Sequence, residues 1–395
     1  MQNLRSKTLF TVRAAAGIVP FVSILGAAHA DRFYGDPPDA NHPWAVHDSN
    51  RPQPPRVEPG TFSSQEKQGT PPSDAIVLFD GAEGSLANWT SSKEKKWIRT
   101  EAGTLQCTPG AGDIHSVAEF GDCQLHVEWT APTEVRGNSQ GRGNSGIFLA
   151  GETEIQVLDN FDNPTYADGF AGSVYGVNPP MANALHKPGE WQVYDIVFRR
   201  PVYKDGEEVD SGHVTVFVNG VLVQDSTPLE GGGGHKSRSK PKPFPEKSRL
   251  KLQDHGNTVQ YRNIWYRPLV PRAVEGGTDG RLSEEAAMAK RKEIAASIRE
   301  DSAELRGSER LLRVMESLCY EQDEETLKRV AEMSDRMIAR LKQASPERLE
   351  ERKGNLMQVR SAFRYMLNHK LLPEGFAAAP ALEELIEAQG WNEKK

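Results

Sequence analysis

Two neighbouring segments near the middle of the chain, Gly143–Leu149 and Glu154–Asp159, constrain its fold more than any other part. The second alternates apolar residues with the polar Glu154 and Gln156. Side chains alternate faces along a β-strand, so the pattern predicts two paired strands with one face in a core and one polar face. A β-bulge after Gln156 would bring Asp159 onto that polar face too. Polar residues on the solvated face of an antiparallel strand are also common without any catalytic role.

Two further segments, Leu125–Trp129 and Arg249–Asn257, show the same alternation. Each predicts a strand with a polar face, although the order of strands in a sheet is not encoded in this spacing. The predicted polar side chains are His126 and Glu128 in the first segment, and Lys251, Gln253 and His255 in the second.

The remainder of the central region also predicts short strands. Asn219-Gly220, between two apolar runs, is a strong signal for a two-residue β-hairpin turn. Many short strands at close spacing indicate a two-sheet sandwich. A long connection from Asn160 to Gly189 carries several aromatic residues, including Tyr175. Its aromatic rings are expected either to pack on the sheet or to stack on sugar rings.

The pattern changes to helical periodicity after Pro271. Apolar stripes at helical spacing predict a bundle of about four or five helices over residues 282–395, joined to the sheet region by a linker over residues 271–281. We interpret the bundle as a spacer, or as a docking domain for another protein or a second subunit. His369 lies at a predicted helix end and suggests no catalysis.

The first 30 residues are typical of a signal peptide. Basic residues precede an apolar run, and Ala28-His29-Ala30 forms a small-x-small cleavage site. The run is too short for a spanning helix, and no other segment approaches that length. We therefore expect an exported protein, periplasmic or extracellular, without a membrane span. Residues 31–73 are rich in proline and predict an extended arm or linker.

The composition of the chain limits the kinds of partner it can bind and the number of disulfides it can form. The chain has 395 residues and a formal net charge of −7, which argues against nucleic-acid binding. Its three cysteines allow at most one disulfide. Free, buried cysteines are the expectation, although pairing of Cys107 with Cys123 stays open and Cys319 lies in a helical pattern. No short metal-binding motif is present.

Several ordered motifs carry a resemblance to a known family. They are the two central segments above, Gly189-Glu190-Trp191, Leu252–Asn257 and Arg262–Trp265, preceded by Ile76–Gly81. Together they resemble the 3-keto-disaccharide hydrolase domain family, formerly a domain of unknown function, over roughly Asp74–Leu269. The resemblance implies a concanavalin A-like jelly-roll sandwich over residues 74–270. The expected fold class is therefore mainly β, with a C-terminal α-helical bundle.

The resemblance also implies chemistry on a keto sugar. A carbonyl at C3 acidifies the hydrogen at C2, so a base can start elimination of the substituent at C1, followed by addition of water. Such a site needs a base, an acid and a donor to the enolate oxygen. The catalytic candidates are Glu154, Asp159, His255 and Glu128. The substrate-binding candidates are Gln156, Gln253, Lys251, His126, Asn144 and Tyr175.

Three alternatives stay open from the sequence. No cofactor is required, but Glu128, Glu154, Asp159 and His255 would suit a divalent metal. The spacing of Glu154, Gln156 and Asp159 also resembles the catalytic strand of laminarinase-type glycosidases, which would make Glu154 and Asp159 an ordinary hydrolytic pair. Finally, a lectin-like sandwich is often a carbohydrate-binding module without catalysis.

Overall fold

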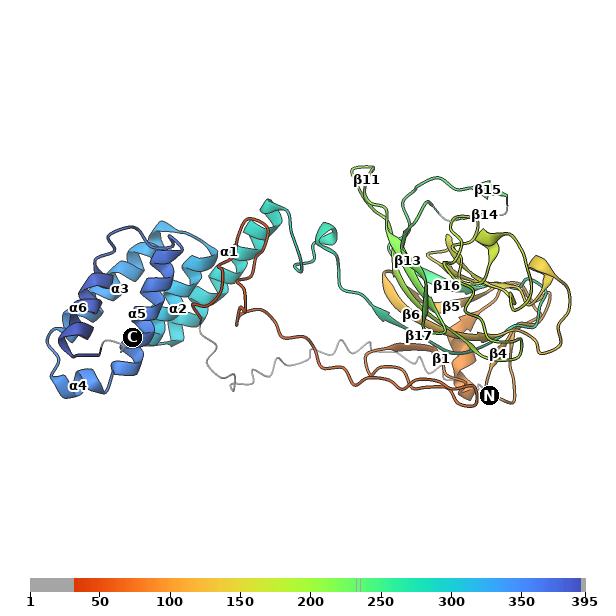
Figure 1. Cartoon of the computed structure of the whole chain (residues 1–395), viewed down its shortest axis with the longest axis horizontal. Coiled ribbons are helices and arrows are strands. Elements are labelled where there is room, and N and C mark those ends of the chain that lie inside the picture. Colours follow the sequence, from red (N-terminus) through yellow and green to blue (C-terminus); the bar gives the residue numbers. More distant parts are fainter. Residues whose placement is uncertain (1–31, 232, 235, 392–395) are drawn as a thin grey trace, which may run out of the picture. The chain divides into compact units, whose positions relative to one another are not determined.

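The structure of the chain is a computed structural model that describes residues 32–391 except residues 232 and 235. The predicted signal peptide over residues 1–30 lies outside the described residues. The chain divides into two compact units (Figure 1). One is the sandwich unit, Gln53–Ala287, and the other combines the described residues up to Pro52 with the helices from Met288 onward.

The sandwich unit contains two antiparallel sheets, which confirms the expected mainly-β fold. One sheet has eight strands. Seven of them follow the order β13 (Val221–Pro228), β12 (His213–Val218), β9 (Gln192–Arg199), β6 (Cys123–Thr130), β17 (Gln260–Pro268), β4 (Leu105–Gln106), β3 (Ile98–Arg99). The eighth, β1 (Ile76–Phe79), also pairs with β17. The other has five strands in the order β2 (Trp89–Thr90), β5 (Ile114–Phe120), β16 (Ser248–Leu252), β7 (Ser145–Leu149), β8 (Thr153–Val157). Two small hairpins project from the unit, β10 (Val202–Lys204) with β11 (Glu207–Asp210), and β14 (Gly233–Gly234) with β15 (Ser237–Arg238).

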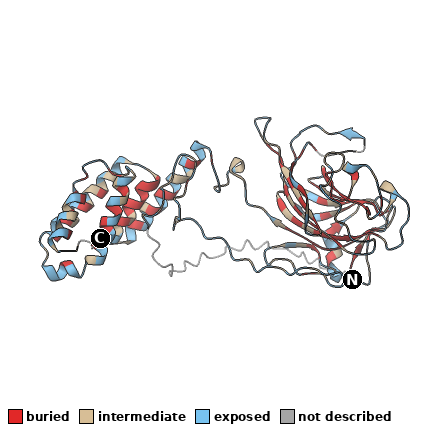
Figure 2. Cartoon of the chain, viewed as in Figure 1, coloured by how far each residue is buried: buried red, intermediate tan, exposed pale blue. Residues whose placement is uncertain are grey.

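The core lies between the inner faces of the two sheets, and Figure 2 shows the buried residues concentrated on the strands there. Leu125, Val127 and Trp129 of β6 are buried, as the alternation predicted. Ile155 of β8 and Leu252 of β16 are buried in the same cluster. Burial of large apolar side chains from both sheets supplies the main stabilisation of a sandwich. The outer faces are therefore left to polar side chains.

The predicted Asn-Gly turn is present between β12 and β13. Asn219 and Gly220 have φ values of 50° and 79°. Two consecutive residues with positive φ form the type I′ turn that matches the twist of a hairpin, and Asn-Gly is the favoured pair for it. The turn thus sets the register of this edge of the sheet.

The helical unit contains six α-helices within its described residues, one or two more than the sequence predicted. They are α1 (Glu284–Asp301), α2 (Gly307–Tyr320), α3 (Glu324–Leu341), α4 (Pro346–Glu350), α5 (Lys353–Asn368) and α6 (Ala378–Ala388). α4 is a short helix with Pro346 at its first position, where proline is favoured. Among the described residues, no helix combines the length and apolar character needed to cross a membrane. Cys107, Cys123 and Cys319 are free and buried, as expected.

The proline-rich arm divides its contacts between the two units. Phe33 and Trp44 pack against the core of the helical unit. Asn50 donates to the Glu316 carboxylate of α2 at 2.7 Å. From Gln53 onward the arm belongs to the sandwich unit instead. There, the Gln65 side chain accepts a hydrogen bond from the Trp191 backbone at 2.6 Å.

Candidate active site

A row of side chains crosses the outer face of the five-stranded sheet. Strand pairing places His115 of β5 opposite Lys251 of β16, and Lys251 opposite Phe148 of β7. Phe148 in turn lies opposite Glu154 of β8. Directly paired residues of antiparallel strands project from the same face. The row therefore brings a histidine, an ammonium group, an aromatic ring and a carboxyl group together on one surface.

The long connection after β8 adds an aromatic residue to this row. A bridge between Ile155 and Val174 continues the sheet, and the Tyr175 backbone donates to the Glu154 carbonyl at 3.0 Å. This register places Tyr175 opposite Glu154, on the face of its side chain. The connection is thus partly an additional edge of the sheet, and it places Tyr175, a predicted binding residue, opposite Glu154.

Glu154 is the acid of this row, and its pKa is far from the usual value. The residue is only 7% exposed. Burial raises the pKa of Glu154 to about 7, with the Asp113 charge adding to the effect and the Lys251 charge opposing it. The carboxyl group lies over Gly146 of β7, where a β-carbon would come within 2.2 Å of Glu154 Oε1. Glycine at this position therefore provides the space for the Glu154 side chain.

Lys251 is held beside Glu154 by two contacts. Its Nζ lies 3.5 Å from the centroid of the Phe148 ring and 3.5 Å from Asp113 Oδ2. Both contacts hold the Lys251 ammonium group in place. On the other side of Lys251, burial lowers the pKa of His115, which favours a neutral imidazole. The row therefore combines a cation with a carboxyl group whose pKa is raised to about 7 and a histidine whose pKa is lowered.

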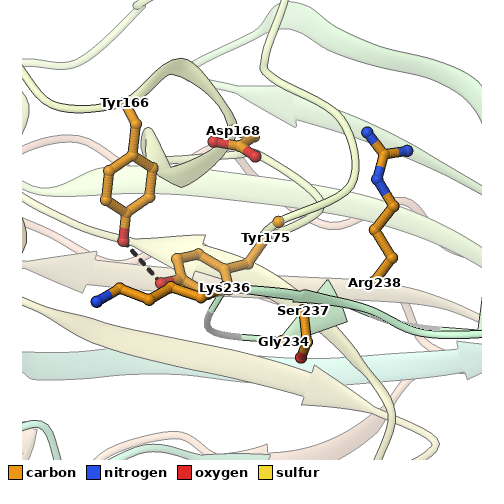
Figure 3. Close-up of a pocket in the computed structure, with 8 residues that line it drawn as sticks. Tyr166, Asp168, Tyr175, Gly234, Lys236, Ser237 and Arg238 are labelled. Carbon is orange, nitrogen blue, oxygen red and sulfur yellow. Dashed lines mark hydrogen bonds between the residues drawn. The ribbon is translucent and has the colours of Figure 1, made fainter.

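An aromatic cavity of about 390 Å³ opens beside Tyr175 (Figure 3). The hydroxyl groups of Tyr166 and Tyr175 are hydrogen-bonded at 2.7 Å. Burial and this hydrogen bond raise the pKa of Tyr166, so it remains a phenol that can donate a proton. Lys236 and Arg238, from the β14–β15 hairpin, also line the cavity, as does Asp168.

Three predicted binding residues have different roles in the structure. Gln253 follows β16, and its side-chain Oε1 is buried without a hydrogen-bond partner among the described residues. Gln156 instead donates to the Gln140 side chain at 2.9 Å, and Asn144 donates to the Gln140 carbonyl at 2.7 Å. Gln156 and Asn144 therefore position the loop around Gln140.

Two predicted catalytic residues do not join Glu154. β8 ends at Val157, and Asp159 forms an ion pair with Arg142 at 2.6 Å in a separate cavity of about 370 Å³. His255 is exposed in the loop that follows β16, because this strand ends at Leu252 and its alternation stops there. No contact in the described part of the chain joins Asp159 or His255 to Glu154.

His126 and Glu128 lie on the other sheet, on the outer face of β6, so placing them at the same site as Glu154 was wrong. His126 Nδ1 is 2.7 Å from Asp195 Oδ1, and Glu128 binds Arg262 Nε at 2.6 Å. The hydroxyl of Ser63 in the arm also donates to Glu128. These residues form a buried network under the arm, and none faces the row of Glu154.

The opposite charges of this network shift the pKa values of His126 and Glu128. Burial alone would lower the pKa of His126, but the hydrogen bonds to Asp195 and Glu128 raise it to about 9. Burial alone would raise the pKa of Glu128, but hydrogen bonds from His126, Ser63 and Asn263 lower it to about 2. Both groups are thus charged at neutral pH and bind each other, which is typical of a structural cluster.

The predicted four-residue metal set is not assembled. Glu128 is on the other sheet, Asp159 is paired with Arg142, and His255 is exposed. Within the described residues, 32–391 except 232 and 235, no group of three or more His, Cys, Asp or Glu side chains is placed to bind a metal ion. Glu154 alone of the four belongs to the row described above.

Sequence reasoning missed several residues of the site. His115 was not singled out from the sequence, although it lies in β5, which begins at Ile114. The alternation from Ile114 to Phe120 would have revealed it. Asp113 and Phe148 carried no separate signal, since their importance depends on contact with Lys251. Tyr166 was recognised only as one of several loop aromatics.

Comparison with known proteins identifies the family of the sandwich domain. The model of the 3-keto-alpha-glucoside-1,2-lyase-like domain family matches residues 74–267. A candidate glycosyl hydrolase from Parabacteroides distasonis ATCC 8503, solved at 2.13 Å, is 42% identical over 55% of this chain and 93% of that protein, with a TM-score of 0.52. No curated protein is significantly similar to the chain.

More distant structures are also similar. A second candidate glycosyl hydrolase from Parabacteroides distasonis ATCC 8503 is 20% identical over 50% of this chain and 94% of its own, with a TM-score of 0.36. The carbohydrate-binding module CBM66 from Bacillus subtilis is 13% identical over 45% of this chain and 93% of its own, with a TM-score of 0.26. Neither is close enough to indicate a function.

The family match and the first relative confirm the resemblance that the motifs indicated. They support a carbohydrate-active enzyme or a carbohydrate binder. Through its sandwich domain, the chain belongs to the 3-keto-alpha-glucoside-1,2-lyase-like domain family.

Proposed function

We propose that the sandwich domain cleaves 3-keto-glycosides by acid/base chemistry, with Glu154 as the base. The observation that carries this proposal is a buried carboxyl group with a pKa of about 7, next to an ammonium group on an open polar face. A general base is most effective when its pKa lies near the working pH. The family supports a keto-sugar substrate.

The first step is removal of the proton at C2. Glu154 takes this proton, and the electrons of the C2–H bond form an enolate with the carbonyl at C3. The enolate oxygen carries the negative charge, and Lys251 supplies the compensating cation. We assign Gln253 to a sugar hydroxyl, because its Oε1 has no partner among the described residues. Glu154 and Lys251 share one face of the sheet.

Cleavage and hydration complete the reaction. The enolate electrons return to form a C1–C2 double bond, the bond from C1 to the leaving oxygen breaks, and a phenol of the Tyr166–Tyr175 pair donates a proton to that oxygen. Water then adds at C1, and the proton returns to C2 from Glu154. The net result is hydrolysis to a 3-keto sugar and an alcohol. The phenol pair regains its proton from the water that adds.

This mechanism assigns one residue as the base and a tyrosine as the acid among the candidates named from the sequence. Glu154 takes the role of base in preference to the exposed His255, and a tyrosine takes the role of acid in place of Asp159 or Glu128. An ordinary retaining mechanism needs a second carboxyl group about 5–5.5 Å from the first. Asp159 is engaged by Arg142 instead. Export to the periplasm or beyond also belongs to the proposal, on the basis of the N-terminal pattern.

The direct test compares an oxidised substrate with its parent. The protein should release p-nitrophenol from p-nitrophenyl 3-keto-α-glucoside at least about 10²-fold faster than from p-nitrophenyl α-glucoside, because only the keto sugar has an acidic C2 hydrogen. The release is followed by absorbance. Equal rates on both would indicate ordinary glycoside hydrolysis, and binding of both without turnover would indicate a carbohydrate-binding module.

Lys251→Met should change the pH profile as well as the rate. The base form of Glu154 is required, so activity should rise as pH rises through about 7. The Lys251 charge lowers the pKa of Glu154, so its removal should move this acidic limb to higher pH and also reduce turnover. The profile of kcat/KM measures both effects. An unchanged limb would mean that Glu154 is not the titrating base.

A further inference from the structure

A groove in the helical unit has a charge opposite to that of the whole chain. It has a volume of about 660 Å³ and lies between the first turn of α2, one face of α3 and the first turn of α5. Glu309 is the only acidic residue in its lining. Six arginines line it: Arg306, Arg310, Arg329, Arg336, Arg340 and Arg352. We call this region the arginine groove.

These arginines are almost without partners within the protein. Arg336 has a weak contact with Glu332 at 4.0 Å, and both side chains are exposed. The other five have no ion pair with any described residue. Arg310 Nε is buried and has no hydrogen-bond acceptor among the described residues. A buried donor without an acceptor is unfavourable, because nothing replaces the hydrogen bond it made to water. The groove therefore lacks the negative groups that its own charges require.

Two helix ends add to the positive potential. α2 and α5 have 14 and 16 residues, and neither has a side-chain hydrogen bond from its N-cap residue, Arg306 or Arg352. At the start of α3, by contrast, the Asp323 side chain accepts from two backbone N–H groups. Uncapped N-termini carry a partial positive charge and free N–H donors. Both ends at the groove thus reinforce the attraction for anions.

The floor of the groove is aliphatic. Met333 and Met337 of α3 are half-buried and line it together with Leu311, Leu341 and Leu356. Methionine adapts its shape to different apolar partners. No aromatic residue is among those that line the groove, so it offers no aromatic ring on which a sugar could stack. An occupant must combine negative charges with aliphatic side chains.

The positions along α3 indicate the form of this occupant. Arginines at positions 329, 336 and 340 alternate with the methionines over residues 329–341, which is about 18 Å of helix. We propose that the arginine groove binds an acidic amphipathic helix of a partner protein. Its carboxylates pair with the arginines, and its aliphatic side chains contact Met333 and Met337. This function is independent of the chemistry at Glu154.

The test uses the full chain and a labelled probe peptide of about 18 residues. The peptide has leucine at helical spacing i, i+3, i+4 and i+7 and glutamate at most other positions, and fluorescence anisotropy measures its binding. The triple variant R329E/R336E/R340E should bind it at least about tenfold more weakly. The matched control K292E/K328E/R348E carries the same change of charge at exposed positions outside the groove, and should stay within about twofold.

Two further probes distinguish the occupants. A peptide with serine in place of leucine should bind at least about fivefold more weakly, because it cannot use the aliphatic floor. Failure of the leucine peptide to bind would overturn the proposal. So would equal binding of the serine peptide, a heparin fragment or a single-stranded oligonucleotide, since the groove would then be a general polyanion site. Concentration-dependent dimerisation that the triple variant abolishes, without peptide binding, would identify a second copy instead.

Discussion

Replacing Glu154 with glutamine is expected to lower turnover of 3-keto-glycosides by about 10²–10⁴-fold. Glutamine has nearly the same size and can remain over Gly146, but it cannot accept the proton from C2. Substrate binding should be largely retained, so the loss appears in kcat measured at pH 7–8. Glu152→Gln is a matched control two residues earlier, in the β7–β8 turn, and should leave turnover within about twofold.

Stability provides the control for a folding defect. The folded-state pKa of Glu154 is raised from 4.5 to about 7, so ionisation is disfavoured in the folded protein. The stability that the neutral carboxyl group gives is present below about pH 4.5 and is lost as pH rises through 7. Glu154→Gln should therefore be as stable as the parent at pH 4 and more stable at pH 8, by up to about 3 kcal/mol. Thermal melts at the two pH values measure this.

Comparing two variants also tests whether Glu154 or His255 is the base. His255 is exposed and has no described contact with the row, so His255→Ala should have little effect on turnover. A variant pair in which His255→Ala abolishes turnover and Glu154→Gln does not would contradict the proposed role of Glu154.

The sequence predicted the faces of individual strands well, but not their neighbours. His126 and Glu128 do project from the outer face of β6, as their alternation indicated. β6, however, pairs with β9 and β17 in the eight-stranded sheet, whereas Lys251 and Glu154 belong to the five-stranded sheet. Long-range pairing decides which polar faces meet, and alternation along a single strand carries no information about it.

Strand ends were a second source of error. His255 would project from the same face as Lys251 only if β16 continued to it. The strand ends at Leu252 instead. The following residues turn because Asp254 binds backbone groups instead of continuing a ladder: its carboxylate accepts from the Gly112 and Gly256 N–H groups at 2.8 and 2.9 Å. Aspartate commonly closes turns in this way. The same feature that ended the strand therefore removed His255 from the polar row.

The arm was the least predictable part of the fold. Its prolines indicated an extended segment, but not which surface it covers. In the structure, Arg262 of β17 donates to the Ser64 backbone carbonyl at 2.5 Å and to Glu128 at 2.6 Å. Its guanidinium also lies 4.2 Å from the centroid of the Trp191 ring. One arginine thus connects the arm, the sheet and a buried carboxylate.

Arg262→Ala is consequently expected to destabilise the sandwich domain by about 3–5 kcal/mol, because it leaves the Glu128 carboxylate buried without its cation. The pKa of Glu128 is lowered to about 2, so its contribution to stability is present above about pH 4.5 and is lost as pH falls toward 2. Without Arg262 this pKa should rise, and the acid-induced loss should begin at a higher pH. Urea unfolding at pH 7 and pH 3 measures both effects.

The double variant Glu128→Gln/Arg262→Met separates charge pairing from loss of the arm. Removal of both charges avoids an unpaired buried carboxylate, so the double variant should be more stable than Arg262→Ala. Turnover of the folded protein should be nearly normal in both, because Glu128 and Arg262 lie on the sheet opposite to Glu154. A large loss of kcat in the folded double variant would contradict this assignment and would return Glu128 to the list of catalytic candidates. Retained kcat with reduced stability is the result that a structural network under the arm requires.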